Sequence, residues 1–502
     1  AFYRKAIERN PRLWKARSEL GINLMRLGRE EEARRHLELC YANGYQSPAT
    51  VNTLRLLDSY RNFENFKTDT TVLRLHKKEA ALLRPYFEAE LQRAIATFQN
   101  KYRLKLKQPV QVEVYPDHED FAVRTLGMPG LGALGVTFGH VVAMDSPSGR
   151  KPGTFHWAST LWHELSHVFV LAATAHRVPR WFTEGMAVHE ETAVSPEWGD
   201  RIAPLVIQAI KEKKLLPVAS LDRGFVRPSY PGQVQVSYFQ AGRICDFINE
   251  RWGYAKLLEM IEAFGRRKHT AEVIQQQLGL APEEFDRRFL AWLEAKTRKL
   301  VDGFDDWRKQ MKALAEAAKA ARHDEVLEGG PALRDLYPDY VEEGNAYELM
   351  AAAHLAKGDS AAAADELERY ARAGGRSPAA LKQLAQLRHK QGRTRDAVAA
   401  LERLLYIDPV SDEELHRRLG EFYLELGEHA GAIREFQAVV AMNPLDQAAA
   451  RFNLAKAYHA AGRLDDALEQ VVASLEAAPG YRPAQKMLLE LSRAQSKEKE
   501  TK

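Results

Sequence analysis

The sequence of 502 residues predicts an α+β domain with a small mixed sheet, flanked on both sides by an α-solenoid of helical repeats. Between residues 66 and 300, short segments with the alternation of strands are followed by helical segments. In the C-terminal part a glycine recurs every 34 or 35 residues, which is the period of paired-helix repeats. We therefore expect three domains, over residues 1–65, 66–300 and 301–502.

Strands are predicted where apolar and polar residues alternate in the middle domain. The segments 70–75 and 109–115 have this pattern, and an amphipathic helix is expected between them over 82–102. A third strand is expected over 135–145, after the glycine-rich stretch 127–135. Later segments of this domain have helical spacing, so the domain should combine a small sheet with several helices.

A pentapeptide, His-Glu-Leu-Ser-His at residues 163–167, lies inside an apolar run with helical spacing. His163 and His167 are four residues apart and therefore lie on one helix face, close enough to bind one zinc ion. Glu164 lies beside that face and can accept a proton from a zinc-activated water. The pattern predicts one zinc ion per chain and hydrolysis of an amide bond.

A catalytic zinc site needs a third protein ligand. The helix is expected to end near Ala175, and Pro179 can begin a second, antiparallel helix. That helix would bring Glu184 back to the two histidines, so Glu184 is the predicted third ligand. Four other side chains remain candidates. They are His176, His189, Glu190 and Glu191.

The pentapeptide and the later segment Pro-Arg-Trp-Phe-Thr-Glu-Gly-Met-Ala, at residues 179–187, together resemble the gluzincin branch of the metallopeptidases, in particular the bacterial peptidase MA-like domains. The resemblance covers about residues 66–300 and implies a thermolysin-like catalytic domain. It also implies that His163, His167 and Glu184 bind zinc and that Glu164 is the general base. In thermolysin-like members an aspartate one turn after the ligand glutamate orients a zinc histidine, whereas this chain has Val188 there.

The same resemblance implies two further features of the site. The edge strand before the active-site helix pairs with an extended substrate in gluzincins, and here that strand is the one expected over 135–145. A tyrosine at the start of a later helix lies close to the zinc in this family and can stabilise an oxyanion. Tyr238 is the first candidate for that catalytic role and Tyr230 the second.

The C-terminal part resembles tetratricopeptide (TPR) repeats. The recurring glycines are Gly358, Gly392, Gly427 and Gly462, and an alanine follows each of them after five residues, at Ala363, Ala397, Ala432 and Ala467. Small residues at these positions let paired helices approach closely. A capping helix is expected over 481–495 and a degenerate connecting pair over 306–330. We expect a protein partner on the concave face of the solenoid, and we expect the single histidines of this region to be surface residues. These are His354, His389, His416, His429 and His459.

The N-terminal part shows the same repeat register, with Leu20-Gly21, Gly28 and Ala33 at the matching positions. Residues 2–7 look like the second helix of a repeat whose first helix is missing. We therefore expect a fragment or processed product, whose true start is not visible in this sequence.

Composition argues against several partners and leaves the compartment open. Lys and Arg number 72 and Asp and Glu 68, a balance that gives no indication of nucleic acid or an anionic membrane as partner. No apolar run approaches the roughly 18 residues of a membrane-spanning helix. Cys40 and Cys245 fall in different expected domains, so a disulfide framework is not expected. A bacterial cell envelope or periplasm and the cytoplasm remain open.

The function that these features favour is that of a zinc metallopeptidase whose repeats hold a protein partner or a peptide or protein substrate. The alternative is a catalytically inactive, protease-like scaffold for protein–protein interaction. The intact set of His163, Glu164, His167 and Glu184 favours the enzyme. A redox iron site on a helical bundle is a weaker alternative, because the strands and the Glu184 segment fit a gluzincin better.

Overall fold

The computed structural model describes residues 2–130 and 132–501. The chain is mostly helical and contains a five-stranded mixed sheet, so the α+β prediction is confirmed. Its contacts divide it into two compact units. Unit 1 comprises residues 1–77, 87–149 and 156–375, and unit 2 comprises residues 78–86, 150–155 and 376–502. The expected domain boundaries at 65/66 and 300/301 stay predictions.

The sheet of unit 1 has the strand order β1-β2-β3-β5-β4. Strands β2, β3 and β5 are parallel neighbours, and β1 and β4 pair antiparallel with β2 and β5 at the two edges. The strands are β1 Phe63–Lys67, β2 Thr71–His76, β3 Val110–Tyr115, β4 Gly135–Phe138 and β5 Val141–Asp145. Every residue of β5 is buried, whereas every residue of β4 is half-buried, as fits an edge strand.

One strand prediction is wrong. The segment 135–145 does not form a single strand but a hairpin, in which β4 and β5 pair with Val136 opposite Ala143. The chain turns at Gly139, whose φ of +68° lies in the left-handed region that glycine adopts without a steric penalty. The edge position expected for this segment belongs to β4, which lies next to the helix that contains residues 163–167. Strand β1 was not predicted from the sequence.

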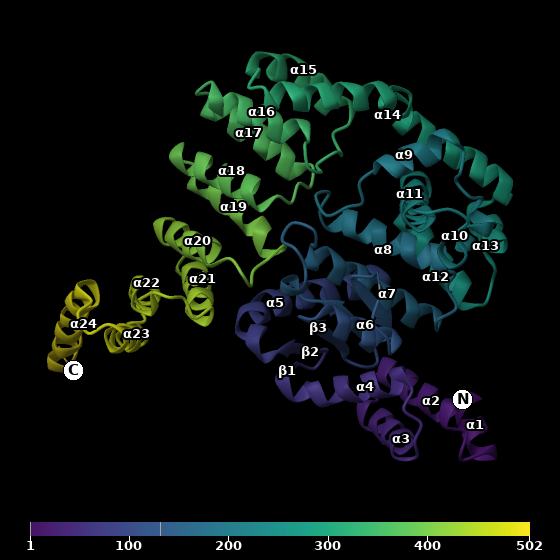
Figure 1. Cartoon of the computed structure of the whole chain (residues 1–502), viewed down its shortest axis with the longest axis horizontal. Helices are drawn as coiled ribbons and strands as arrows, with labels where there is room; N and C mark the ends of the chain where they lie inside the picture. Colours follow the sequence, from purple (N-terminus) through teal and green to yellow (C-terminus); the bar gives the residue numbers. More distant parts are fainter. Residues whose placement is uncertain (1, 131, 502) are drawn as a thin grey trace. The chain divides into compact units, whose positions relative to one another are not determined.

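The helices of unit 1 surround the sheet and continue beyond it (Figure 1). Those up to the end of the long connecting helix are α1 Phe2–Arg9, α2 Trp14–Arg26, α3 Glu30–Ala42, α4 Pro48–Ser59, α5 Lys77–Tyr102, α6 His118–Leu126, α7 Trp157–Thr174, α8 Arg180–Val194, α9 Pro204–Lys211, α10 Asp222–Val226, α11 Gln233–Trp252, α12 Tyr254–Gly265, α13 Thr270–Leu278 and α14 Pro282–Lys319. They are followed by α15 His323–Leu336, α16 Ala346–Ala356 and α17 Ser360–Arg372. Residues 78–86 of α5 belong to unit 2.

Two helices begin or end at other residues than the sequence predicted. The pair expected over 306–330 is the end of the 38-residue helix α14, which also runs through position 300, followed by α15. Helix α11 begins at Gln233, so that Tyr238 lies in its second turn rather than at its start. Gly232, with a φ of +83°, immediately precedes this helix.

The core of unit 1 is aromatic where α5 meets α7. Phe87 stacks on Trp157 with ring centroids 4.1 Å apart, and Phe98 meets the edge of Trp162 at 5.2 Å. All four side chains are at most 2 % exposed. Because such rings bury a large apolar area each, this contact fixes α7 against the body of the domain.

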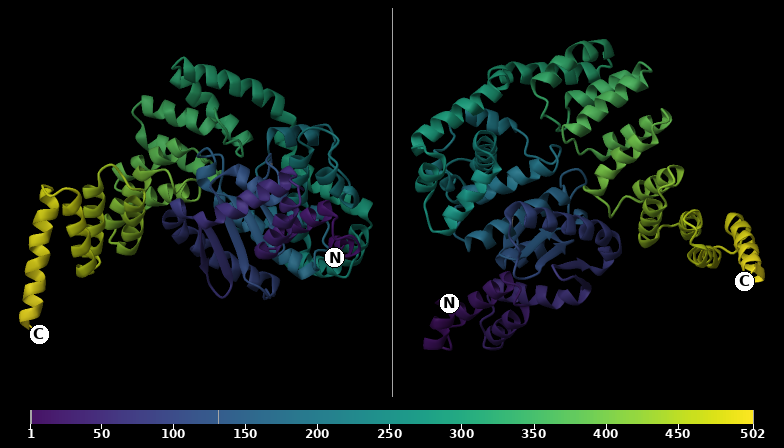
Figure 2. Two further views of the ribbon diagram at one scale, coloured as in Figure 1. Left: turned by 60° about the horizontal axis from the view of Figure 1, so that its bottom comes forward. Right: turned by 180° about the vertical axis from the view of Figure 1, so that it is seen from behind.

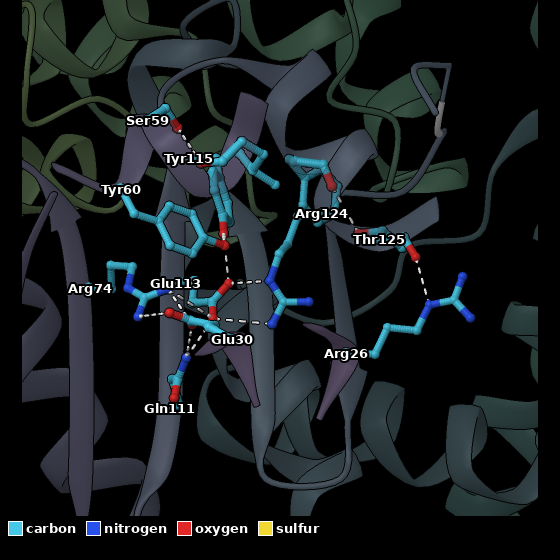
Figure 3. A network of polar contacts seen from close by, with 12 residues as sticks. Arg26, Glu30, Ser59, Tyr60, Arg74, Gln111, Glu113, Tyr115, Arg124 and Thr125 are labelled. Carbon is cyan, nitrogen blue, oxygen red and sulfur yellow. Dashed lines mark hydrogen bonds and ion pairs between the residues drawn. The ribbon is translucent and has the colours of Figure 1, made fainter. Parts of the chain in front are cut away.

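The N-terminal helices are joined to the sheet by a network of buried charges (Figure 3). Glu113 of β3 accepts hydrogen bonds from Arg124 of α6, with Nε 2.6 Å from Oε2. Arg74 of β2 lies 3.5 Å from the same carboxylate and donates two hydrogen bonds to Glu30 of α3. Tyr115 donates to Glu113 as well. Helix α3 is therefore tied to the sheet of unit 1.

Unit 2 contains the later repeats, built from successive helix pairs (Figures 1 and 2). Its helices are α18 Pro378–Lys390, α19 Thr394–Leu405, α20 Glu413–Glu425, α21 His429–Ala441, α22 Gln447–Ala460, α23 Leu464–Ala477 and α24 Arg482–Thr501. The recurring glycines all have a φ of +72° to +81°, and all four recurring alanines are fully buried. The repeat pattern is confirmed, and α24 lies where a capping helix was expected.

The two cysteines, Cys40 and Cys245, are free and buried, in accord with the expected absence of a disulfide framework. Among the described residues, no helix combines the length and apolar character needed to cross a membrane.

Candidate metal centre

Helix α7 presents the two histidines of the pentapeptide on one side. It begins after His156, whose Nδ1 accepts a hydrogen bond from the backbone of Ser159 at 3.0 Å. Its apolar residues from Trp157 to Val170 are buried, so that the helix has a fixed rotation in the domain. His163 and His167 meet edge to face with ring centroids 4.8 Å apart. Both rings are largely buried, with side chains 16 % and 11 % exposed.

Helix α8 returns along α7 and brings the predicted third ligand to the pair. The turn between them contains Ala175 and His176, both with positive φ, and Pro179 directly precedes α8. Oε2 of Glu184 lies 3.3 Å from Nε2 of His163 and 3.2 Å from Nε2 of His167. The ligand atoms of these three side chains lie within 4.8 Å of one another.

This donor set suits zinc. Two imidazole nitrogens and one carboxylate oxygen are a ligand set of catalytic zinc sites, which keep one further position open. The charges also favour a cation. Burial alone would raise the pKa of Glu184, but the two histidines lower it well below its usual value. Conversely, burial would lower the pKa of His163, but Glu184 and Glu191 raise it well above 6.5. Carboxylates that stabilise a proton here also stabilise a divalent ion.

The four competing ligand candidates are not part of the group of three side chains that could bind one ion. His189 pairs with Asp246 at 2.7 Å, and Glu190 accepts a hydrogen bond from Tyr254 at 2.6 Å. His176 lies beside Gly139 at the turn between β4 and β5. Glu191 contacts the site, but on the far side of a ligand ring, where its Oε1 lies 2.7 Å from Nδ1 of His163. Within the described part of the chain, none of the four joins the group of three.

Glu164, the expected general base, is 5 % exposed and lies against the edge strand β4. Thr137 of β4 donates a hydrogen bond of 2.6 Å to its Oε2. Gly135 leaves the room that Glu164 occupies, because a Cβ there would lie 2.7 Å from the Cγ of Glu164. The resemblance predicted an edge strand beside the proposed active site, but it did not predict the contacts of Thr137 and Gly135 with Glu164. Gly135 and Thr137 are two residues apart on the strand, so both lie on the face that is turned toward α7.

Of the two candidate tyrosines, Tyr238 lies at the site. Its ring centroid is 6.3 Å from that of His163 and 5.1 Å from that of Phe225, which it meets edge to face. Burial first, and then the charge of Glu184, raise the pKa of Tyr238, so the phenol keeps its proton. Tyr230 instead lies under Lys214, whose ammonium is 5.0 Å from the ring centroid.

Further polar contacts to the ligands were not identified from the sequence. Thr183 Oγ1 lies 2.8 Å from Nδ1 of His167, and Arg180 Nη2 lies 3.0 Å from Oε1 of Glu184. Both residues belong to α8, as does Glu191. Arg180 precedes Glu184 by four residues and Glu191 follows it by seven, spacings that put both near the same face of the helix, whereas Thr183 is adjacent to Glu184 and has no such signal in the sequence.

Family models match most of the described architecture. Residues 90–295 match the Peptidase MA superfamily, and residues 349–412 and 417–482 match a tetratricopeptide repeat family. A second tetratricopeptide repeat model matches residues 14–38. The chain thus contains a Peptidase MA superfamily domain together with TPR repeats, as the sequence motifs predicted.

Comparisons with whole proteins add less. No curated protein matches the chain. Among solved structures, YrrB, "a TPR protein with an unusual peptide-binding site", is 19 % identical over 38 % of this chain and 96 % of its own, with a TM-score of 0.29. MamA from Desulfovibrio magneticus RS-1 is 23 % identical over 30 % and 84 %, with a TM-score of 0.26. A thermophilic TPR protein from Thermus thermophilus is 20 % identical over 37 % and 98 %, with a TM-score of 0.22.

Proposed function

We propose that this chain is a zinc-dependent metallopeptidase that hydrolyses peptide bonds. The zinc ligands are His163, His167 and Glu184, and the general base is Glu164. The Peptidase MA superfamily match supports the class of enzyme. The observation that carries the proposal is the position of Glu184, whose Oε2 lies within 3.3 Å of both histidine Nε2 atoms although α8 is a separate helix.

A zinc ion bound by these residues supplies Lewis acidity, which polarises a carbonyl and lowers the pKa of water toward neutrality. The protein supplies the proton transfer. Glu164 follows His163 on α7, and Thr137 holds its Oε2, which keeps Oε1 for proton transfer. Glu164 accepts the proton of the attacking water and passes it to the departing amine, so that the carboxylate is restored at the end of the reaction.

Tyr238 and strand β4 act on the substrate. The protonated phenol of Tyr238 donates a hydrogen bond to the oxyanion that develops on the scissile carbonyl. Strand β4 is at the sheet edge, where an extended peptide can add as a further strand. Backbone pairing of this kind aligns a peptide without selecting strongly among side chains. A peptide bound along β4 would pass directly over Glu164, because Gly135 and Thr137 both contact that residue.

The TPR repeats bind a protein partner or the substrate on their concave face. The recurring alanines are fully buried between helices, so these residues serve packing rather than recognition. What remains for a partner is the free surface of the helix pairs, the usual binding surface of such arrays.

The proposal is tested by measuring zinc content and cleavage of a mixed fluorogenic peptide library on the same preparations of the full chain. The parent should hold one zinc ion and cleave. Glu164→Gln should keep zinc and lose about a hundred- to ten-thousand-fold in turnover. His163→Ala and Glu184→Ala should lose zinc. Glu476→Gln, at an exposed position of α23, is the control and should change neither.

The results separate the candidate functions. Cleavage by Glu164→Gln at the parental rate, or full zinc occupancy in both ligand variants, would contradict the proposed site. Zinc bound by a parent chain that cleaves no peptide would favour the inactive scaffold.

A further inference from the structure

Each of the three proposed ligands is contacted by a second side chain, and all three of these side chains come from α8. Glu191 Oε1 lies 2.7 Å from Nδ1 of His163, and Thr183 Oγ1 lies 2.8 Å from Nδ1 of His167. Arg180 Nη2 lies 3.0 Å from Oε1 of Glu184. One helix therefore carries a ligand and a partner for every ligand.

Val188, one helical turn after Glu184, packs against α11 and cannot make a polar contact to a ligand. Val188 is 8 % exposed and lies against α11, where a Cβ on Gly242 would be 2.5 Å from its Cγ1. Gly185 brings the same two helices together, since a Cβ there would lie 2.5 Å from the backbone oxygen of Ala241. A carboxylate at position 188 would therefore face α11 rather than α7.

Glu191 lies seven residues, about two helical turns, beyond Glu184 and therefore on nearly the same side of α8. From there its carboxylate reaches the ring of His163 on α7, and its side chain is only 17 % exposed. The contact is thus partly shielded from water, which makes a charge-assisted hydrogen bond stronger than it is on a surface.

We infer that Glu191 is a positioning residue of the metal centre, which orients His163, and that Thr183 does the same for His167. This inference rests on the proposed function, because it needs the metal ion. An acceptor at Nδ1 holds the ring proton on that nitrogen, and so directs the lone pair of Nε2 toward the ion. Both Nε2 atoms face Oε2 of Glu184 in this arrangement.

Arg180 contacts the third proposed ligand, the carboxylate of Glu184. Its guanidinium engages Oε1 of Glu184, while Oε2 is the atom that faces both histidines. The two carboxylate oxygens therefore have separate partners. Glu191 is the strongest of the three partners, because it brings a charge to a ligand ring, whereas Thr183 brings a neutral hydroxyl and Arg180 is about half exposed.

The test measures zinc affinity by competition with a chelator on the full chain, alongside the visible spectrum of the cobalt(II)-substituted protein. The spectrum reports the ligand geometry, which a loss of fold stability alone does not change. Glu191→Ala should weaken zinc binding about ten- to a hundredfold and alter the cobalt spectrum. Glu191→Gln keeps an acceptor oxygen without the charge, and should give a smaller loss.

Threonine variants provide a matched pair. Thr183→Val should weaken zinc binding, and Thr183→Ser, which keeps the hydroxyl, should restore the parental affinity. Thr192→Val is the control on the same helix, because the hydroxyl of Thr192 bonds to the backbone of Val188 and not to a ligand. Melting of the metal-free chains shows whether each variant is folded.

The outcomes distinguish this inference from the proposed function. Parental affinity and an unchanged cobalt spectrum in Glu191→Ala would overturn the inference alone. A parent chain that binds zinc no better than His163→Ala would overturn the proposed function, and the inference with it.

Discussion

The hydroxyl of Thr137 donates a hydrogen bond of 2.6 Å to Oε2 of Glu164, and so joins the edge strand β4 to the glutamate between the two histidines. The same hydroxyl lies 3.0 Å from the backbone oxygen of Glu164. The carboxylate is thus oriented by a strand as well as by its own helix. A substrate that pairs with β4 would be aligned with the proposed general base by the same element.

Thr137→Val should reduce turnover about tenfold or more, because a hydrogen bond to a charged group contributes about 1.5–3 kcal/mol. Valine has the shape of threonine without the hydroxyl, so zinc content should stay at the parental value. Thr137→Ser should retain most of the activity. Steady-state cleavage of one peptide by the three chains checks this prediction, and equal kcat values for the valine variant and the parent would contradict it.

Gly135→Ala should impair cleavage by displacing Glu164. The added Cβ would lie 2.7 Å from Cγ and 2.8 Å from Oε1 of that residue, closer than such atoms approach in folded proteins. Gly132→Ala is the matched control, since its Cβ would meet nothing within 4 Å. A loss of kcat in the first variant but not in the second, at equal zinc content, is the expected result.

Much of this site follows from the sequence, because local spacing determines it. The separation of His163 and His167 fixes their common face, and the return of the chain near Pro179 is enough to place Glu184. Thr137 and Glu191 could not be placed in the same way. Their contacts depend on the hairpin turn at Gly139 and on the close packing of α8 on α11 at Gly242, which are tertiary features.

The sequence also did not predict which histidines of the repeats are buried. All five were expected to be surface residues, but His416 is fully buried, with its Nδ1 2.7 Å from Oε2 of Glu435. The repeat spacing fixes which alanines and glycines pack between helices. It does not determine which polar residues are buried together, because that depends on the partner helix.

Tyr238→Phe should lower kcat by less than Glu164→Gln does, because zinc also polarises the carbonyl that the phenol contacts. The phenylalanine keeps the packing on Phe225 and removes only the hydroxyl. Tyr230→Phe is the matched control, since that ring lies under Lys214 and should not affect turnover. A loss in the control as large as that in Tyr238→Phe would remove Tyr238 from the mechanism.

Glu113 should make the stability of unit 1 depend on pH in the acid range. Burial would raise the pKa of this carboxyl, but Arg124 and Arg74 lower it to about 2. A carboxyl whose pKa is lower in the folded than in the unfolded state stabilises the fold above its unfolded value. That contribution is lost as the pH falls from about 4.5 toward 2.

Glu113→Gln tests this account by unfolding at several pH values. It leaves the buried guanidinium of Arg124 without its counter-charge, and breaking such a pair costs about 3–5 kcal/mol at neutral pH. The variant should also lose less stability than the parent on acidification. Arg34→Ala removes an exposed ion pair with Asp58 and should cost no more than about 1 kcal/mol. A similar small cost for both variants would show that the network in Figure 3 contributes little.

The last prediction concerns the buried polar group in unit 2. Both ring nitrogens of His416 lie within hydrogen-bond distance of an oxygen, Nδ1 at 2.7 Å from the carboxylate of Glu435 and Nε2 at 2.9 Å from the backbone oxygen of Pro409. Tyr86 donates to the same carboxylate at 3.0 Å. Burial would raise the pKa of Glu435, but its contacts with His416 and Arg434 lower it, so the carboxylate is charged at neutral pH.

Glu435→Gln should therefore destabilise α20 and α21, because His416, Tyr86 and Arg434 would lose the buried charged carboxylate that they contact, at a cost of about 1–3 kcal/mol. Hydrogen exchange of the backbone amides of these two helices is the measurement, and a loss of about 3 kcal/mol corresponds to exchange more than a hundredfold faster. Glu421→Gln removes an exposed partner of Arg417 on α20 and should leave exchange nearly unchanged. Zinc content should stay at the parental value in both variants, because the proposed ligands belong to unit 1. Exchange at the parental rate in Glu435→Gln would show that the buried pair does not hold these repeats together.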